Sequence, residues 1–168
     1  MTLTYEDAIA LRWPFRLDDH KFDTKYPYLT EVPIENRLDD VDPGWNWVIH
    51  RIETREVVGG QSEIKVTVHG SLTIKGVTRD GIGQAVTRQS KEAKTNTATG
   101  EVYTDEINSA EKNAATDALK RAARLFGVGR YLLTTQKAGI KTRDQLERWL
   151  NAAVQAAEKN GHAELSGK

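Results

Sequence analysis

EIKVTVHGSLTIKGVTRDGIGQA, residues 63–85, carries the clearest alternation of apolar and polar side chains in the chain. Over 64–74 the apolar residues share one parity and Lys, Thr, His and Ser take the other, which is typical of a β-strand with one face in water. Lys75-Gly76 is a turn candidate, and 77–85 would then pair back as the next strand. Asp80-Gly81 is a competing turn, so the sequence leaves the register of that strand open.

The segment before this pair predicts one more strand. In 45–49 the residues Trp, Trp and Ile alternate with other side chains, and the run ends at Gly59-Gly60. Three strands in succession favour an antiparallel meander. Farther upstream the sequence predicts short helices over 5–11 and 34–41, with a polar loop over 16–25 between them.

The segment after the strands predicts two helices. The first begins at Ser109, carries alanines that would let it lie close against a sheet, and stops at Gly127. The second follows Thr142, which forms a capping box with Gln145 ahead of an apolar stripe. The fold class is therefore predicted to be α+β, with three or more antiparallel strands packed on a long helix and an amphipathic C-terminal helix.

The length of 168 residues favours one domain, predicted over 1–160. Residues 87–105 are rich in Thr, Lys, Asn and Glu and lack a periodic apolar set. We expect them to be a mobile insertion with a small hairpin around Thr99-Gly100. Residues 161–168 are predicted to be a disordered tail.

The distribution of charge is more informative than its total. The 24 Lys and Arg balance the 24 Asp and Glu, yet 1–60 carries a net charge of −5 and 61–144 one of +5. Such opposite fields favour self-association, and an open basic surface attracts phosphate. The sequence has no cysteine, which excludes disulfides, thiolate catalysis and cysteine zinc sites. No apolar run could span a membrane and the first residues lack a signal peptide, so we expect a cytoplasmic protein.

Acidic clusters are the best candidates for an enzyme. The clusters at 39–42 and 101–106 would supply carboxylates to a metal-dependent nuclease. Adjacent residues at a helix end point apart, however, so a solvated surface is the favoured interpretation. His50 and His69 lie on different predicted strands without a third ligand, and no Ser-His-Asp arrangement can be assembled. We therefore expect no enzyme, no cofactor and no metal site.

The long helix carries a regular row of positions four residues apart, most of them cationic. The row consists of Lys112, Thr116, Lys120 and Arg124, with Arg121 beside it. Only Glu111 and Asp117 interrupt its positive charge. Cations about 6 Å apart suit the repeat of a nucleic-acid backbone. The alternative is the ordinary solvent face of an amphipathic helix, with Lys and Arg favoured near its C-terminal end by the macrodipole.

The run SAEKNAATDALKRAARLFG, residues 109–127, resembles the signature helix of the Rad52-type single-strand annealing proteins. The continuation VGRYL, residues 128–132, is similar to that of the DdrA-like branch found in bacteria and phages. Supporting matches lie upstream at Tyr28-Leu29 and Pro43-Gly44-Trp45. The resemblance covers 26–133 in matching order.

This resemblance implies a curved antiparallel sheet packed on the long helix, in subunits assembled side by side into a ring. Single-stranded DNA would run in a positively charged groove of the ring, held by its backbone with the bases turned outward. The implied function is annealing of complementary strands in recombination and double-strand break repair, without ATP or metal; protection of 3′ ends without annealing is the alternative. The DNA-binding residues carried over by the family pattern are Lys120, Arg121 and Arg124, with Lys112 on the same helix face. Tyr28 matches an aromatic residue that lines the groove, Arg16 or Lys21 would be a further cation, and Arg130 is also expected to bind DNA.

The resemblance also implies partners and a location. Besides DNA and further copies of the chain, the expected partner is a single-strand-binding protein or a phage exonuclease, and a membrane is not expected. The protein would be encoded by a bacterium or a phage and act at the nucleoid. The segment 87–105 is longer than expected for this branch and would be a loop or a flexible finger over the DNA.

Overall fold

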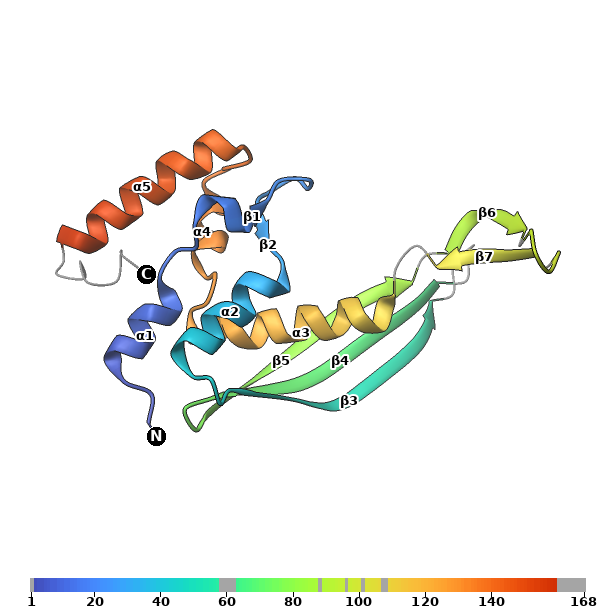
Figure 1. The fold of residues 1–168 in the computed structure, drawn as a ribbon, viewed down its shortest axis with the longest axis horizontal. Coiled ribbons are helices and arrows are strands. Elements are labelled where there is room, and N and C mark those ends of the chain that lie inside the picture. Colours follow the sequence, from blue (N-terminus) through green and yellow to red (C-terminus); the bar gives the residue numbers. More distant parts are fainter. Residues whose placement is uncertain are drawn as a thin grey trace. The chain divides into compact units, whose positions relative to one another are not determined.

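The structure, a computed structural model, describes residues 2–57, 63–87, 89–95, 97–100, 102–106 and 109–159 (Figure 1). These residues form two compact units. The first unit is drawn from 1–46, 73–79 and 123–168, and the second from 47–72 and 80–122. Antiparallel strand pairs and five α-helices within the described ranges confirm the α+β class.

The first unit is built mainly from short helices. Its elements are α1 (Tyr5–Arg12), the 3-10 helix η1 (Leu17–Asp19), β1 (His20–Lys21), β2 (Tyr28–Leu29), α2 (Glu31–Val41), α4 (Tyr131–Lys137) and α5 (Arg143–Lys159). The two short helices predicted upstream are present as α1 and α2. The polar loop predicted over 16–25 is wrong in part, because η1 and β1 lie within it.

A small apolar core holds α5 within this unit. Ile140, Leu146 and Leu150 form a buried cluster, and Tyr131 and Trp149 pack against it. The rings of Tyr131 and Trp149 are stacked with their centroids 5.6 Å apart. The apolar stripe of α5 is therefore the side of the helix that packs into this core.

The predicted capping box at the start of α5 is confirmed. The backbone N–H of Gln145 donates to Thr142 Oγ1 at 3.3 Å, and the backbone N–H of Thr142 donates to Gln145 Oε1 at 3.2 Å. These two bonds satisfy amide groups that the first turn of a helix leaves without partners.

The meander is confirmed as a three-stranded sheet. Its strands are β3 (Asn46–Val57), β4 (Glu63–Ile74) and β5 (Val77–Thr87), in the order β3-β4-β5. Lys75 and Gly76 have φ of 46° and 79°, the left-handed values that a two-residue hairpin turn requires. The hydroxyls of Thr73 and Thr78 meet across this turn at 2.9 Å. The competing turn at Asp80-Gly81 is wrong, because both residues lie inside β5.

The helix α3 (Ala110–Phe126) contacts this sheet through small side chains. One buried cluster joins the helix to β4 and contains Val66, Val68, Ala110, Ala114 and Ala118. On β5, a Cβ built at Gly83 would lie 2.1 Å from Ala114 O, and one built at Gly81 would lie 2.0 Å from Ala118 O. The two glycines therefore allow the helix backbone to approach the strand backbone directly.

A separate hairpin follows the sheet in the chain. It consists of β6 (Gln89–Thr95) and β7 (Val102–Glu106), with Thr95 paired to Val102. The loop that joins them contains Gly100, with φ of 71°, and confirms the small hairpin predicted there. The predicted tail 161–168 lies outside the described residues. No helix in the described part of the chain is long and apolar enough to cross a membrane.

Candidate nucleic-acid interface

Hydrogen bonds fix both ends of α3. At its start, Ser109 Oγ accepts the backbone N–H of Lys112 at 3.5 Å. At its end, Gly127 takes φ of 108° and the N–H of Val128 donates to Ala123 O at 3.2 Å, which is the six-to-one bond of a Schellman cap. The helix therefore ends at the glycine that the sequence predicts as its stop.

The cations of α3 follow a path that winds around the helix. A step of four residues advances about 40°, so the path from Lys112 to Arg124 turns through about 120°. Lys120 follows the buried Ala118 by two residues, as Arg124 follows the buried Ala122, which places each cation on the side opposite its alanine. Lys112 is exposed, whereas Lys120 and Arg124 are half-buried.

A carboxylate one turn earlier in the helix holds Arg121. The Nε–H of Arg121 donates to Asp117 Oδ2 at 2.9 Å, and the same oxygen accepts the backbone N–H of Gln84 on β5 at 3.1 Å. The side chains of Arg121 and Asp117 are 56% and 34% exposed. In the sequence, Asp117 is visible only as a negative charge among the cations of the helix. Its bond to Gln84 leaves no pattern in the sequence, because the donor is a backbone amide.

The structure assigns a helix cap to Arg130. Its guanidinium donates to the carbonyl oxygens of Arg124 and Leu125, each at 3.0 Å. These carbonyls lie in the last turn of α3, where helices leave acceptors without partners. A contact of Arg130 with DNA stays a prediction.

Two further predicted residues face each other on the small β1–β2 sheet of the first unit. Lys21 pairs directly with Tyr28 in the antiparallel register. Lys21 is exposed and Tyr28 is half-buried. A hydrogen bond to the carboxylate of Asp23 raises the pKa of Tyr28, so its phenol is neutral near pH 7. The structure thus brings together an ammonium group and an aromatic ring, which suit phosphate and base respectively.

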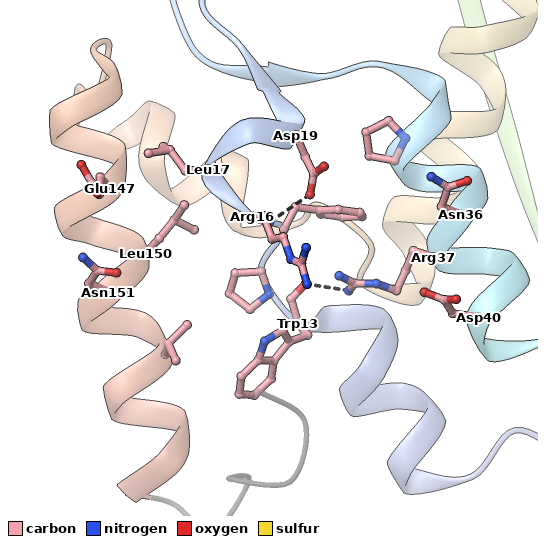
Figure 2. A pocket seen from close by; sticks show the side chains of 14 residues that line it. Trp13, Arg16, Leu17, Asp19, Asn36, Arg37, Asp40, Glu147, Leu150 and Asn151 are labelled. Atoms are coloured by element: carbon pink, nitrogen blue, oxygen red, sulfur yellow. Dashed lines mark hydrogen bonds between the residues drawn. The ribbon is translucent and has the colours of Figure 1, made fainter. Parts of the chain in front are cut away.

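Arg16, the remaining candidate, lines a cavity of about 530 Å³ in the first unit (Figure 2). The walls come from 13–19, α2 and α5. On one wall the guanidinium of Arg37 donates to Trp13 O at 2.8 Å and lies 4.3 Å from the centre of the Phe15 ring. Because three distant segments form the cavity, no local pattern in the sequence reveals it.

Comparison with known proteins identifies the family. Residues 15–148 match the Rad52/22 family, described as double-strand break repair proteins. The chain belongs to the Rad52/22 family. The match includes the three-stranded sheet and the whole of α3. The cation path therefore lies within the part of the chain that defines membership of the Rad52/22 family.

Two curated relatives of this Rad52/22 chain carry the name single-stranded DNA-binding protein DdrA. The one from Deinococcus radiodurans is 37% identical over 105 residues, which is 62% of this chain and 38% of the relative. The one from Deinococcus deserti is 36% identical over 112 residues, which is 66% of this chain and 43% of the relative. The chain thus matches about two fifths of the length of each, and the DdrA-like branch is confirmed.

The acidic cluster near the start of this Rad52/22 domain has structural partners. Asp39 Oδ1 accepts the indole N–H of Trp45 at 2.7 Å, and Asp42 Oδ2 accepts the backbone N–H of Lys75 at 2.6 Å. Within the described ranges, no group of three or more His, Cys, Asp or Glu could hold a metal ion. Glu101 of the second cluster lies outside the described residues.

The structure does assemble a His, a Ser and an Asp on the sheet, which sequence analysis did not foresee. His50 Nε2 lies 2.6 Å from Ser71 Oγ, and the Ser71 hydroxyl donates to Asp80 Oδ1 at 2.5 Å. In a catalytic triad the histidine stands between the serine and the acid and takes the serine proton. Here the serine stands in the middle, so the arrangement links three strands and does not activate a nucleophile.

Proposed function

We propose that this chain binds single-stranded DNA without regard to sequence and anneals complementary strands in recombination and double-strand break repair. The observation that carries the proposal is the path of Lys112, Lys120 and Arg124 along α3, with Arg121 beside it, on a helix whose alanines contact β4 and β5. Membership of the Rad52/22 family and the name of the two relatives support the same conclusion.

The mechanism follows from the chemistry of these side chains. Lys112, Lys120, Arg121 and Arg124 neutralise successive phosphates and release condensed counterions, which supplies binding energy that is independent of base sequence. Because the cations grip the backbone, the bases stay available to pair with a second strand. No step of this scheme uses ATP or a metal ion.

Further contacts are proposed outside α3. Lys21 and Tyr28, neighbours across β1 and β2, would add one phosphate contact and one stacking surface, and Arg16 and Arg130 would add charge. We also propose that the subunits assemble into a ring with the sheet curved along it, so that the cations of successive copies form one groove. A single-strand-binding protein or an exonuclease would deliver the DNA.

Replacement of the cations tests the binding site. We expect the triple variant Lys120→Ala, Arg121→Ala, Arg124→Ala to weaken oligonucleotide binding by at least about tenfold, because several charge-assisted contacts are lost. The slope of log affinity against log salt should flatten by about 0.7 for each phosphate contact removed. Fluorescence anisotropy with labelled oligo(dT) at several salt concentrations measures both quantities.

The matched control removes three exposed cations from α4, α5 and the segment between them. Lys137→Ala, Lys141→Ala and Arg148→Ala change the net charge equally, and all three residues are exposed. We expect this control to retain most of the affinity. If the α3 variant stays folded and binds as tightly as the control, the site assignment is wrong.

A pairing assay separates annealing from end protection. We expect the protein to accelerate pairing of two complementary labelled oligonucleotides, followed by fluorescence quenching, with EDTA present and ATP absent. A protein that only protects 3′ ends would slow this pairing, because it would hold each strand apart from its complement. Slower pairing with intact binding would therefore contradict the annealing function.

A further inference from the structure

We propose that Asp117 is a positioning residue that orients the guanidinium of Arg121 toward a phosphodiester of single-stranded DNA. The inference rests on the proposed function and adds to it a residue of the same charge as the ligand. Such a residue should weaken binding of a polyanion by Coulomb repulsion. Its geometry indicates the opposite effect.

The first observation is the sharing of one oxygen. Asp117 Oδ2 accepts both the backbone N–H of Gln84, at 3.1 Å, and the Nε–H of Arg121, at 2.9 Å. The strand amide fixes the carboxylate, and the carboxylate in turn fixes the guanidinium. A side chain with several free rotations is thereby held in one place before any ligand arrives, which lowers the entropy cost of binding.

The second observation is the part of Arg121 that this bond uses. The ion pair engages Nε, and the two terminal nitrogens have no other partner among the described residues. Those nitrogens form the end of the guanidinium that binds phosphate oxygens through two parallel hydrogen bonds. The Arg121 side chain is 56% exposed, so this end is accessible.

Gln84 anchors the arrangement from the strand side. Its backbone donates to Asp117, and its side-chain Nε2 donates to Thr67 Oγ1 on β4 at 3.4 Å. Ala118, the next residue after Asp117, contacts the strand through the close approach at Gly83. The carboxylate therefore lies next to a point where the backbones of the helix and the strand approach each other closely.

Three variants distinguish positioning from charge. Asp117→Ala removes the acceptor and should weaken binding of labelled oligo(dT) by about fivefold to tenfold, because Arg121 loses its fixed orientation. Asp117→Asn keeps an oxygen acceptor for both donors and should bind within about twofold of the wild type. Arg121→Lys keeps the charge but lacks both the Nε–H that Asp117 accepts and the pair of terminal nitrogens that would bind the phosphate. It should weaken binding to a degree similar to Asp117→Ala.

A double-mutant cycle distinguishes positioning from a structural role. In an Arg121→Ala background, Asp117→Ala should no longer weaken binding and should tighten it slightly, because only the repulsive charge remains to be removed. A structural role predicts the same loss in both backgrounds. Thermal melting of each variant shows that the comparison is made between folded proteins.

The outcomes separate this inference from the proposed function. If the wild-type protein does not bind the oligonucleotide, the proposed function fails. If the wild type binds and Arg121→Ala weakens binding, but Asp117→Ala tightens it or acts equally in both backgrounds, only the positioning role is overturned. Coupling between the two sites, together with rescue by Asp117→Asn, supports it.

Discussion

His20 shows how a single buried residue ties the first unit together. Its side chain is 3% exposed, with Nδ1 2.8 Å from Arg16 O and Nε2 2.5 Å from the Tyr131 hydroxyl. A neutral ring fits these partners, because Nδ1–H then donates to the carbonyl and Nε2 accepts from the phenol. The Tyr131 oxygen also accepts the backbone N–H of Phe15 at 3.4 Å. Protonation of Nε2 would replace an acceptor with a donor in this series of hydrogen bonds.

The stability of the protein should therefore fall in mild acid. Burial lowers the pKa of His20 below its ordinary value of 6.5, so between the two values the unfolded state binds more protons than the folded state. The free energy of unfolding should be constant above about pH 6.5 and should decrease as the pH falls below that value. Urea titrations at about pH 7.5 and about pH 5.5 measure the difference, and His20→Gln should reduce it. A stability that rises on acidification through this range would contradict the assignment.

For single residues, the sequence predicts where the charged side chains lie better than it predicts their hydrogen-bond partners. The spacing of Lys112, Lys120 and Arg124 is visible in the sequence because a helix converts intervals of four into one path. The role of Asp117 is not visible, because one of its partners is a backbone amide on another element. His20 and Tyr131 are 111 positions apart, and no local pattern joins them.

The contact between α3 and β5 depends on two residues without side chains. A Cβ at Gly81 or Gly83 would lie 2.0 or 2.1 Å from a helix carbonyl oxygen, which is far inside contact distance. Gly81→Ala or Gly83→Ala should therefore force the helix from the strand and cost about 3 kcal/mol or more in free energy of unfolding. Urea denaturation followed by circular dichroism measures this loss.

Gly44→Ala is the matched control for these variants. A Cβ there would lie 3.3 Å from the carboxylate of Asp42, a far smaller overlap than at Gly81 or Gly83, and Gly44 is exposed. We expect a change within about 0.5 kcal/mol. If Gly83→Ala is as stable as Gly44→Ala, the close approach of α3 to β5 is wrong.

The predictability of each element depends on its length. The strands β3, β4 and β5 have 11 or 12 residues, long enough for alternation to repeat several times, and the sequence predicts all three. β1 and β2 have two residues each and α4 has seven, so neither period can be seen in them. Gln84 lies within a correctly predicted strand, but its bond to Asp117 needs the tertiary structure.

The whole molecule carries its charge unevenly along the chain, with −5 over 1–60 and +5 over 61–144. Head-to-tail contact between unlike surfaces would close into a ring where the rotation between neighbours permits. Light scattering at low salt and micromolar protein should therefore give a mass several times that of one 18.8 kDa chain. The assembly should become smaller as salt screens the contacts. A mass of a single chain under these conditions would contradict the ring.

Family membership is the property of the whole molecule that the sequence predicts best. The resemblance over 26–133 lies inside the matched range 15–148. The sequence predicts the family because the run from Ser109 to Gly127 is both long and specific. The division of the described residues into two units is not visible in the sequence, because each unit draws on separate stretches of the chain.

The bond from the Gln84 amide to Asp117 has a consequence for the way copies of the chain can meet. In the described sheet β5 has a neighbouring strand on one side only, and this amide points to the other side, where a helix carboxylate already occupies it. Sheet extension from one molecule into the next along this border would require that carboxylate to leave. The bond therefore blocks strand pairing at this point of the border, as natural sheets do where they protect an exposed edge.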